Sequence, residues 1–383
     1  MSQPGRALIL DGMWSKSVAA VRSLGRRGIR ITAGESTRWA AALFSRYCNR
    51  AWVYPSPWRS PDRFLEALVD ELRKGGYEAV IPMETQTQLV LSRGRSALAP
   101  FVRIPLPEHE TCERLNDKLH QLRLARQVGV PCPRTWVPAS WEELHALAPK
   151  LPYPAVIKPR VSSGSRGVRY VRSARELLHR YGEVHAAFPW PMVQEYIPHG
   201  GAYGVGVLLN FRSQIRAAFV YRRLREYPVR GGPSTLRMSV RDPGLEATAV
   251  RLLQAAGWVG VAMVEFRVDA RDGVPKLMEI NPRFWGSLQL AILAGVDFPF
   301  LLYRMVREGD VEPVSGYREG VLCRSWIPGE ILHLVHRPSA LARVRRSHGD
   351  DLLSRDDPWP VVGRLLSAMA LLWDRDFRRV VRR

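Results

Sequence analysis

Residues 260–283 read GVAMVEFRVDARDGVPKLMEINPR, and this stretch decides the fold. Two apolar runs, 260–269 and 275–280, flank a short polar segment that contains Asp272-Gly273. An Asp-Gly pair between two apolar runs is typical of a tight β-hairpin. We therefore expect two neighbouring antiparallel strands joined by a turn at residues 271–273.

Oxygen-bearing side chains lie near the ends of both expected strands. Glu279 and Asn281 share one face because side chains alternate along a strand, and antiparallel pairing brings Glu265 opposite them. Two carboxylates and an amide oxygen suit Mg²⁺. A surface pair of acids balanced by Arg is the alternative. We favour the metal site, because both Glu residues end apolar stretches.

Arg283 follows Asn281 by two residues and points the same way if the strand continues past Pro282. A guanidinium at this position is suited to hold a transferring phosphoryl group or a bound carboxylate.

A second candidate site lies upstream, where the apolar run 155–158 ends in Lys158. The loop 162–167 that follows is built of Ser, Gly and Arg. A Lys at a strand end reaches phosphate oxygens as a point charge, and the N–H groups of such a loop approach phosphates closely. The segment lacks the GxxxxGK[ST] pattern, so it is not a P-loop. An ordinary turn is the alternative.

Residues 192–197, Met-Val-Gln-Glu-Tyr-Ile, run from an apolar strand into a polar hinge. Such a hinge offers a backbone N–H and C=O to the edge of an adenine. Taken alone, the same residues also fit a plain buried strand.

Outside these segments the chain predicts a mixed α/β and α+β protein. A strand at 6–10, a helix at 15–27 and a strand at 29–32 make a βαβ start, which favours a parallel sheet. One helix is expected over 112–128, and a long connection over 222–240. The expected domains are an open α/β domain at 1–110, an α+β unit at 111–190, a second sheet at 191–312, and a C-terminal extension at 313–383 with an amphipathic helix at 360–379.

Composition narrows the function classes. The net charge is +21, but only six of the 57 basic side chains are Lys, and the Arg residues are scattered. A solvated Arg-rich surface explains this better than a nucleic-acid partner, because no basic stripe is interleaved with aromatic residues. The four cysteines form no CxxC pair, and no apolar run approaches the roughly 20 residues of a membrane span. We expect a cytoplasmic protein without a membrane span and without a specific nucleic-acid partner.

In this order, the segments resemble the ATP-grasp superfamily. The likeness is closest to its carboxylate–amine ligase branch, as in one synthetase half of the carbamoyl phosphate synthase large subunit. It is carried by residues 116–118 with 129–131, 153–159 with 162–167, 194–197, and 265–283. It covers residues 1 to about 310 and implies an ATP-grasp fold with an N-terminal pre-ATP-grasp domain. It also implies ATP and Mg²⁺ as cofactors, with Mn²⁺ as an alternative ion.

The resemblance implies a role for each matched residue. Lys118 and Lys158 bind phosphates, Arg283 and Lys158 act in catalysis, and Glu265, Glu279 and Asn281 hold the metal. The remaining nucleotide contacts are expected from Ser162, Ser163, Gly164, Ser165, Gly167, Glu195, Tyr196 and Ile197. The chain departs from the family in one place: residues 198–203, just after the hinge, contain no acid to hold the ribose hydroxyls.

The Arg- and Gly-rich segment 222–237 is the candidate for substrate selection, because its guanidinium groups pair with carboxylates. The residues that we assign to it are Arg230, Gly231, Gly232, Ser234 and Arg237. A solvated basic loop fits the same residues equally well.

Together these features predict a ligase that phosphorylates a small-molecule carboxylate and joins the acyl phosphate to an amine, forming an amide or peptide bond. The alternative is a nucleotide-binding sensor without turnover, which the missing ribose acid favours. A homodimer is compatible with the sequence.

Overall fold

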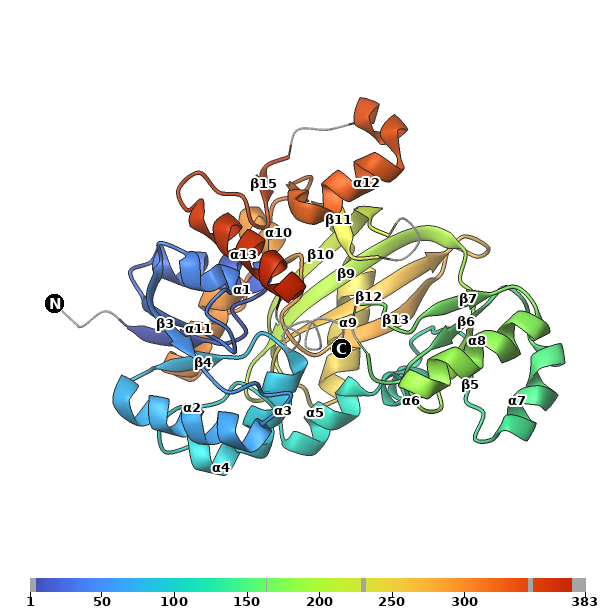
Figure 1. Ribbon diagram of the computed structural model, residues 1–383, viewed down its shortest axis with the longest axis horizontal. Coiled ribbons are helices and arrows are strands. Elements are labelled where there is room, and N and C mark those ends of the chain that lie inside the picture. The colour runs from blue at the N-terminus through green and yellow to red at the C-terminus, as the bar shows by residue number, and fades with distance from the viewer. Residues whose placement is uncertain (1–4, 163, 229–231, 344–346, 374–383) are drawn as a thin grey trace.

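The structure, a computed structural model, describes residues 5–162, 164–228, 232–343 and 347–373. These residues form three β-sheets, which lie side by side along the long axis of the molecule (Figure 1). The sheet formed first along the chain lies at one end, a small sheet lies at the other, and a large sheet lies between them.

The N-terminal sheet is fully parallel, as the βαβ start predicts. In spatial order its strands are β3 (Cys48–Val53), β2 (Arg30–Glu35), β1 (Arg6–Ile9) and β4 (Ala79–Ile81). Its helical segments are α1 (Ser15–Gly25), η1 (Ala41–Phe44), α2 (Pro61–Gly75), α3 (Thr85–Arg93) and α4 (Arg95–Leu98). The central strand β1 has no exposed apolar side chain, because α1 and α2 cover the sheet.

The small sheet has the spatial order β5 (Thr135–Trp136), β8 (Met192–Glu195), β6 (Ala155–Lys158) and β7 (Arg169–Val171). The helices α7 (Trp141–Leu147) and α8 (Ala174–Ala187) pack on it and share a separate hydrophobic core with it. Strand β8 pairs with both β5 and β6, so the small sheet extends to residue 195 rather than ending before 191.

The predicted helix at 112–128 is two helices, α5 (His109–Asn116) and α6 (Lys118–Gln127). Asp117 separates them because its backbone is extended and its carboxylate accepts a hydrogen bond from the N–H of Leu119 at 2.8 Å. The break makes Lys118 the first residue of α6.

The large sheet has the spatial order β13 (Pro275–Asn281), β12 (Gly260–Asp269), β9 (His199–Leu209), β10 (Ile215–Glu226), β11 (Ser234–Ser239), β14 (Leu322–Arg324) and β15 (Gly349–Asp350). The expected hairpin at 260–283 is present. The expected long connection at 222–240 is wrong, since most of it belongs to β10 and β11, which pair antiparallel. The helices beside this sheet are α9 (Pro243–Ala255), α10 (Leu288–Ala294) and α11 (Phe298–Glu308).

The N-terminal and large sheets share their hydrophobic cores. One core joins Ile9 and Val18 to Phe219 and Trp285, and another joins Leu68 to the inner face of the large sheet. The two sheets therefore form one packed body, and the small sheet stands beside it with its own core.

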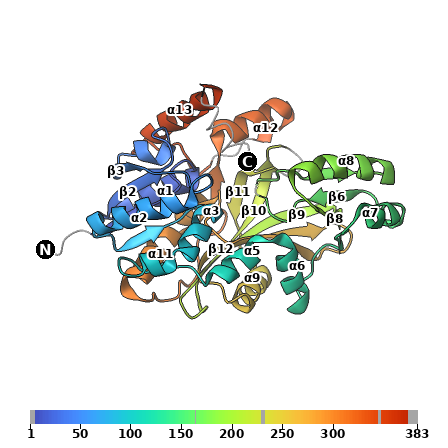
Figure 2. The same ribbon diagram turned by 60° about the horizontal axis from the view of Figure 1, so that its bottom comes forward.

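The C-terminal segment continues the large sheet through β14 and β15 and adds α12 (Ile331–His336) and α13 (Trp359–Trp373). Figure 2 shows α13 lying along the N-terminal α/β unit. Gly363 is the contact point, because a side chain there would meet Phe44 and the backbone of Ala41 on η1.

In the described part of the chain, no single helix is long and apolar enough to cross a membrane. Helices α10 and α11 reach the required length and composition only as a pair, with an 85° bend between them.

Candidate functional site

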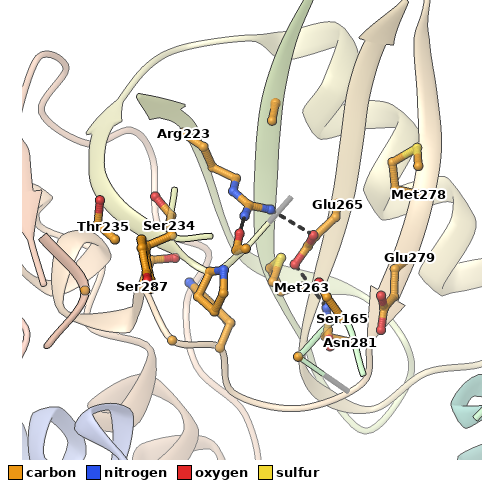
Figure 3. Close-up of a pocket in the computed structure, with 18 of the residues that line it drawn as sticks. Ser165, Arg223, Ser234, Thr235, Met263, Glu265, Met278, Glu279, Asn281 and Ser287 are labelled. Carbon is orange, nitrogen blue, oxygen red and sulfur yellow. Dashed lines mark hydrogen bonds and ion pairs between the residues drawn. The ribbon is translucent and has the colours of Figure 1, made fainter. Parts of the chain in front are cut away.

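The hairpin brings the three predicted metal ligands together. Glu265 lies directly opposite Glu279, and Met263 opposite Asn281. The Asn281 Nδ2 atom donates to Glu265 Oε1 at 3.3 Å, which leaves the amide oxygen of Asn281 unused by this bond. Figure 3 shows Glu265, Glu279 and Asn281 on one wall of a cavity.

This cavity has a volume of about 590 Å³ and lies where the three sheets meet. Its lining includes residues of the hairpin, of the small sheet and its loop, of α1, Glu84 just before α3, and residues of the C-terminal segment. Sequence-predicted site residues therefore contribute to one shared space.

Two buried lysines face the hairpin acids. Lys118 Nζ lies 3.3 Å from Glu279 Oε1 and donates to the carbonyl of Ser162 at 2.5 Å. Lys158 Nζ donates to the carbonyl of Met278 at 2.8 Å. Burial lowers the pKa of Lys158 to about 8, although the charge of Glu279 opposes this shift. The structure places both predicted phosphate-binding lysines beside the predicted metal ligands.

The two hairpin carboxylates differ electrostatically. Burial raises the pKa of Glu265, although Arg223, whose Nη1 lies 3.2 Å from Glu265 Oε2, acts in the opposite direction. Burial acts on Glu279 too, but the charges of Lys118 and Lys158 outweigh it and lower the pKa of that carboxyl. Sequence reasoning placed Arg223 in the substrate segment and missed its contact with Glu265.

The loop after Lys158 has the backbone expected of a phosphate-binding turn. Gly164, Ser165 and Gly167 all have φ between 60° and 72°, the left-handed region that Gly adopts at little cost. A side chain at Gly167 would meet Pro159 and Phe188, so only Gly fits there. Ser162, Gly164 and Ser165 line the cavity, whereas the predicted Ser163 lies outside the described residues.

The hinge residues Glu195, Tyr196 and Ile197 also line the cavity. The N–H of Glu195 donates to the carbonyl of Arg134 at 3.0 Å. Its carboxylate accepts from the Arg134 N–H at 3.0 Å and lies near Arg271 and Lys276. Neither group of Glu195 is therefore directed at a ligand. Among the described residues, the N–H of Ile197 forms no hydrogen bond.

The predicted substrate residues divide into three groups. Arg230 and Gly231 lie outside the described residues. Gly232 and Ser234 line the cavity, and the carbonyl of Gly232 accepts a hydrogen bond from Arg223. Arg237 also lines it but is almost completely buried in an ion pair with Asp351. The expectation that Arg237 is available to pair with a substrate carboxylate is thus not met, because Asp351 already occupies its guanidinium.

A family model and solved structures match this architecture. The model described as "ATP-grasp in the biosynthetic pathway with Ter operon" matches residues 187–325. The biotin carboxylase domain of the Hydrogenobacter thermophilus 2-oxoglutarate carboxylase, crystallised with MgADP and bicarbonate, aligns with a TM-score of 0.69, covering 84% of this chain and 74% of that chain at 17% identity. An L-amino acid ligase from Bacillus licheniformis aligns with a TM-score of 0.63 over 82% and 79% of the two chains at 16% identity.

Residues 187–325 are thus similar to an ATP-grasp family, and the fold of the chain is that of ATP-grasp enzymes. The chain is 31% identical to the uncharacterized protein y4rH of Sinorhizobium fredii over 48% of its length. It is 27% identical to biotin carboxylase 1 of Bacillus subtilis over 73% of its length, and 23% identical to the carbamoyl phosphate synthase large chain of Xylella fastidiosa over 45%. It spans 39%, 65% and 17% of those relatives, respectively. The superfamily and the likeness to carbamoyl phosphate synthase are confirmed.

Helix α1, which packs on the N-terminal sheet, adds a charged group to the cavity. Lys16 is buried, lies 2.7 Å from Glu84 Oε1 and donates to the carbonyl of Phe284 at 3.0 Å. Arg283 donates to the same carbonyl at 2.8 Å, and its Nε lies 3.6 Å from Glu84 Oε2. Arg283 thus reaches the cavity past Pro282. The scarcity of Lys is the sequence signal that marks Lys16, which sequence reasoning did not assign to the site.

The C-terminal segment was also missed as part of the site. Its cavity-lining residues are Ser325, Ile327, Pro328, Gly329, Leu332, Asp351 and Arg364. The N–H of Ser325 donates to the carbonyl of Thr235 at 2.9 Å, and Figure 3 shows Thr235 with Ser234 and Ser287 on the opposite side from Glu279 and Met278. No local pattern in the sequence links these residues to the hairpin, because they reach the cavity through tertiary contacts: the pairing of β14 with β11 and the packing of α13 on η1.

Proposed function

We propose that this protein is an ATP- and Mg²⁺-dependent carboxylate–amine ligase that acts through an acyl phosphate. The observation that carries the proposal is the meeting of Glu265, Glu279 and Asn281 with Lys118 and Lys158 in one cavity. Oxygen ligands on one side and buried cations on the other suit a metal-bound triphosphate.

The donor set fits a magnesium ion. Among the residues that the structure describes, no three His, Cys, Asp or Glu side chains are placed together to hold a metal. The proposed set differs from such a cluster, because it has two carboxylates and one amide oxygen. Glu265, Glu279 and the amide oxygen of Asn281 would hold the ion together with phosphate oxygens. When bound, the ion neutralises negative charge on the phosphates. A hard-oxygen set of this kind serves Mn²⁺ as well.

The nucleotide sites follow from the same geometry. Lys118, Lys158 and the N–H groups of the loop 162–167 would bind the phosphates. The N–H of Ile197 would face the adenine, since that of Glu195 is taken by Arg134. Tyr170 and Tyr196, whose rings lie 5.9 Å apart, line the cavity near this hinge.

The reaction proceeds in two displacements. A carboxylate oxygen of the substrate attacks the γ-phosphorus, and the bond to ADP breaks. The amine nitrogen then attacks the acyl carbon, the bond to phosphate breaks, and the amine proton passes to solvent. Lys158 and Arg283 stabilise the negative charge that moves during these steps, and the protein contributes mainly positioning and charge neutralisation. The structurally similar L-amino acid ligase from Bacillus licheniformis is named for a ligation of this kind.

The test compares amine-dependent phosphate release for wild type and Glu279→Gln. We expect a loss of about 100-fold or more, because the neutral amide removes one charge from the metal site. Glu66→Gln, an exposed position on α2, is the matched control and should keep wild-type rates. Equal rates for Glu279→Gln and wild type at saturating Mg²⁺ would refute the metal role.

A second candidate function is nucleotide sensing without turnover. It is favoured by residues 198–203, which carry no acid for the ribose. His199 in this stretch accepts a hydrogen bond from the N–H of Gly201 at 3.0 Å. Thermal stabilisation by MgATP without ADP release, across a broad panel of acids and amines, would establish this function instead.

A further inference from the structure

The C-terminal segment is fixed rigidly where it closes the cavity. Arg22 of α1 binds the buried Asp357 through Nε at 2.8 Å and donates to the carbonyl of Leu352 at 2.9 Å. Ser45 and the N–H of Arg46 donate to the same carboxylate at 2.7 and 2.8 Å. This network, together with the contact of Gly363 with η1, sets the position of the neighbouring residue Arg364.

Arg364 enters the cavity from α13 with most of its hydrogen-bonding capacity unused. Its Nη2 donates to Ser15 Oγ at 3.2 Å. Its Nε is fully buried and has no hydrogen-bond partner. Within the described residues, the Arg364 guanidinium forms no ion pair.

Arg237 and Arg364 lie near one carboxylate, that of Asp351. Asp351 is the carboxylate whose charge acts on Arg364, but it already pairs with Arg237. Burial lowers the pKa of Arg364, and the charge of Asp351 acts in the opposite direction. A buried charge without a partner is costly, and the neutral hydroxyl of Ser15 does not neutralise it. A bound group with one negative charge would complete this site.

The Arg364 site is distinct from the metal end of the cavity. In the part of the chain that the structure describes, Arg364 forms no hydrogen bond or ion pair with Glu265, Glu279, Lys118 or Lys158. The side chain comes from α13 and meets Ser15, the first residue of α1. An anion bound by Arg364 would therefore be held by residues other than the metal ligands and the phosphate-binding lysines.

We propose that Arg364 and Ser15 bind a carboxylate group that the substrate keeps through the reaction. This inference rests on the proposed ligase function and specifies its substrate class. A guanidinium binds a carboxylate through two parallel hydrogen bonds, and a single negative charge matches the single unpaired Arg. The retained carboxylate belongs either to an amino-acid acceptor or to a dicarboxylic donor.

Two probe pairs separate these sources. L-Alanine and L-alaninamide represent the acceptor with and without the carboxylate, and glutarate and glutaramate represent the donor. Binding of each is measured by calorimetry with Mg²⁺ and a non-hydrolysable ATP analogue present. For one pair, wild type is expected to bind the carboxylate form at least ten-fold more tightly than the amide, and this preference should fall below two-fold in Arg364→Gln.

The variants keep the test decisive. Arg355→Gln, exposed on the same segment and outside the cavity, should retain the full preference. Arg364→Lys keeps the charge but loses the planar fork, so it should retain part of the preference even if Arg364→Gln does not fold. The proposal is overturned if the folded Arg364 variants prefer the carboxylate over the amide as strongly as wild type does. It is also overturned if wild type shows no such preference in either probe pair.

Failure of the ligase function is seen separately. The calorimetric signal of the nucleotide itself, in wild type and Glu279→Gln, reports on the metal and phosphate sites. Carboxylate binding is also measured without nucleotide. If wild type binds no nucleotide but keeps its preference for the carboxylate, the ligase function is refuted and the Arg364 site is retained.

Discussion

At the scale of single residues, the site depends on opposed charges held close together. Glu265 and Glu279 face each other across two strands, and two acids in this register repel. Arg223 and Lys118 offset this repulsion, each on its own carboxylate. These cationic partners therefore allow the two carboxylates to lie next to each other in the folded protein.

Lys16 carries a prediction about pH. Burial lowers its pKa from 10.5 to about 8, with Arg283 adding to the shift and Glu84 opposing it. Between these values the unfolded chain holds the proton and the folded chain has released it, so the free energy of unfolding rises with pH. Relative to Lys16→Met, wild type should gain about 2 kcal/mol between pH 7 and 9.5, as measured by urea denaturation.

The control for this experiment is Lys74→Met, an exposed position on α2. It should reproduce the wild-type pH profile. A constant stability difference between wild type and Lys16→Met over this range would show that Lys16 stays charged in the fold.

At the scale of elements, contacts between helices far apart in the sequence position the site. Helix α13 lies on η1 at a spot where only Gly fits: a Cβ at Gly363 would come within 2.7 Å of the Phe44 ring and 2.9 Å of Ala41 Cα. Backbone cannot yield as a flexible side chain does, so a larger residue must push the two elements apart.

Gly363→Val should therefore lower the free energy of unfolding by about 1–3 kcal/mol. The matched control is Gly182→Ala on α8, where nothing lies within 4 Å of the new methyl group. That change should raise stability by about 0.5–1 kcal/mol, because Ala favours helix. Chemical denaturation of both variants checks this, and an unchanged midpoint for Gly363→Val would contradict the close packing.

At the scale of the whole molecule, the N-terminal sheet, the large sheet and the C-terminal segment form one body. Shared cores join the two sheets, and the Arg22–Asp357 pair joins α1 to the C-terminal segment. Both partners of this pair are almost completely buried, so breaking it leaves an uncompensated charge in the interior.

Arg22→Met should lower the free energy of unfolding by about 3–5 kcal/mol. Arg26→Met removes a nearby pair with Asp356, whose partners are 38% and 43% exposed, and should cost less than about 1 kcal/mol. Thermal and urea unfolding of both variants test the difference. Similar losses for the two would mean that burial does not distinguish these pairs.

The sequence by itself determined those parts of the protein that depend on local patterns. The alternation around the Asp-Gly turn predicted the pairing of Glu265 with Glu279, and the βαβ start predicted the parallel sheet. Strand alternation and turn chemistry act over a few residues, so they are readable without the fold. The prediction of one continuous helix over 112–128 was wrong, although it too used a local pattern, because the cap formed by Asp117 interrupts an otherwise helical sequence.

Only the tertiary structure decided which distant side chains meet in the cavity. Lys16 contacts Phe284 across 268 positions, and Arg364 contacts Ser15 across 349. Periodicity specifies which face of an element is buried but not which element covers it. The partner of a buried charge is set by the packing of distant segments rather than by residues nearby in the chain. For this reason only the fold shows that Arg237 pairs with Asp351 and that Arg364 has no ion-pair partner among the described residues.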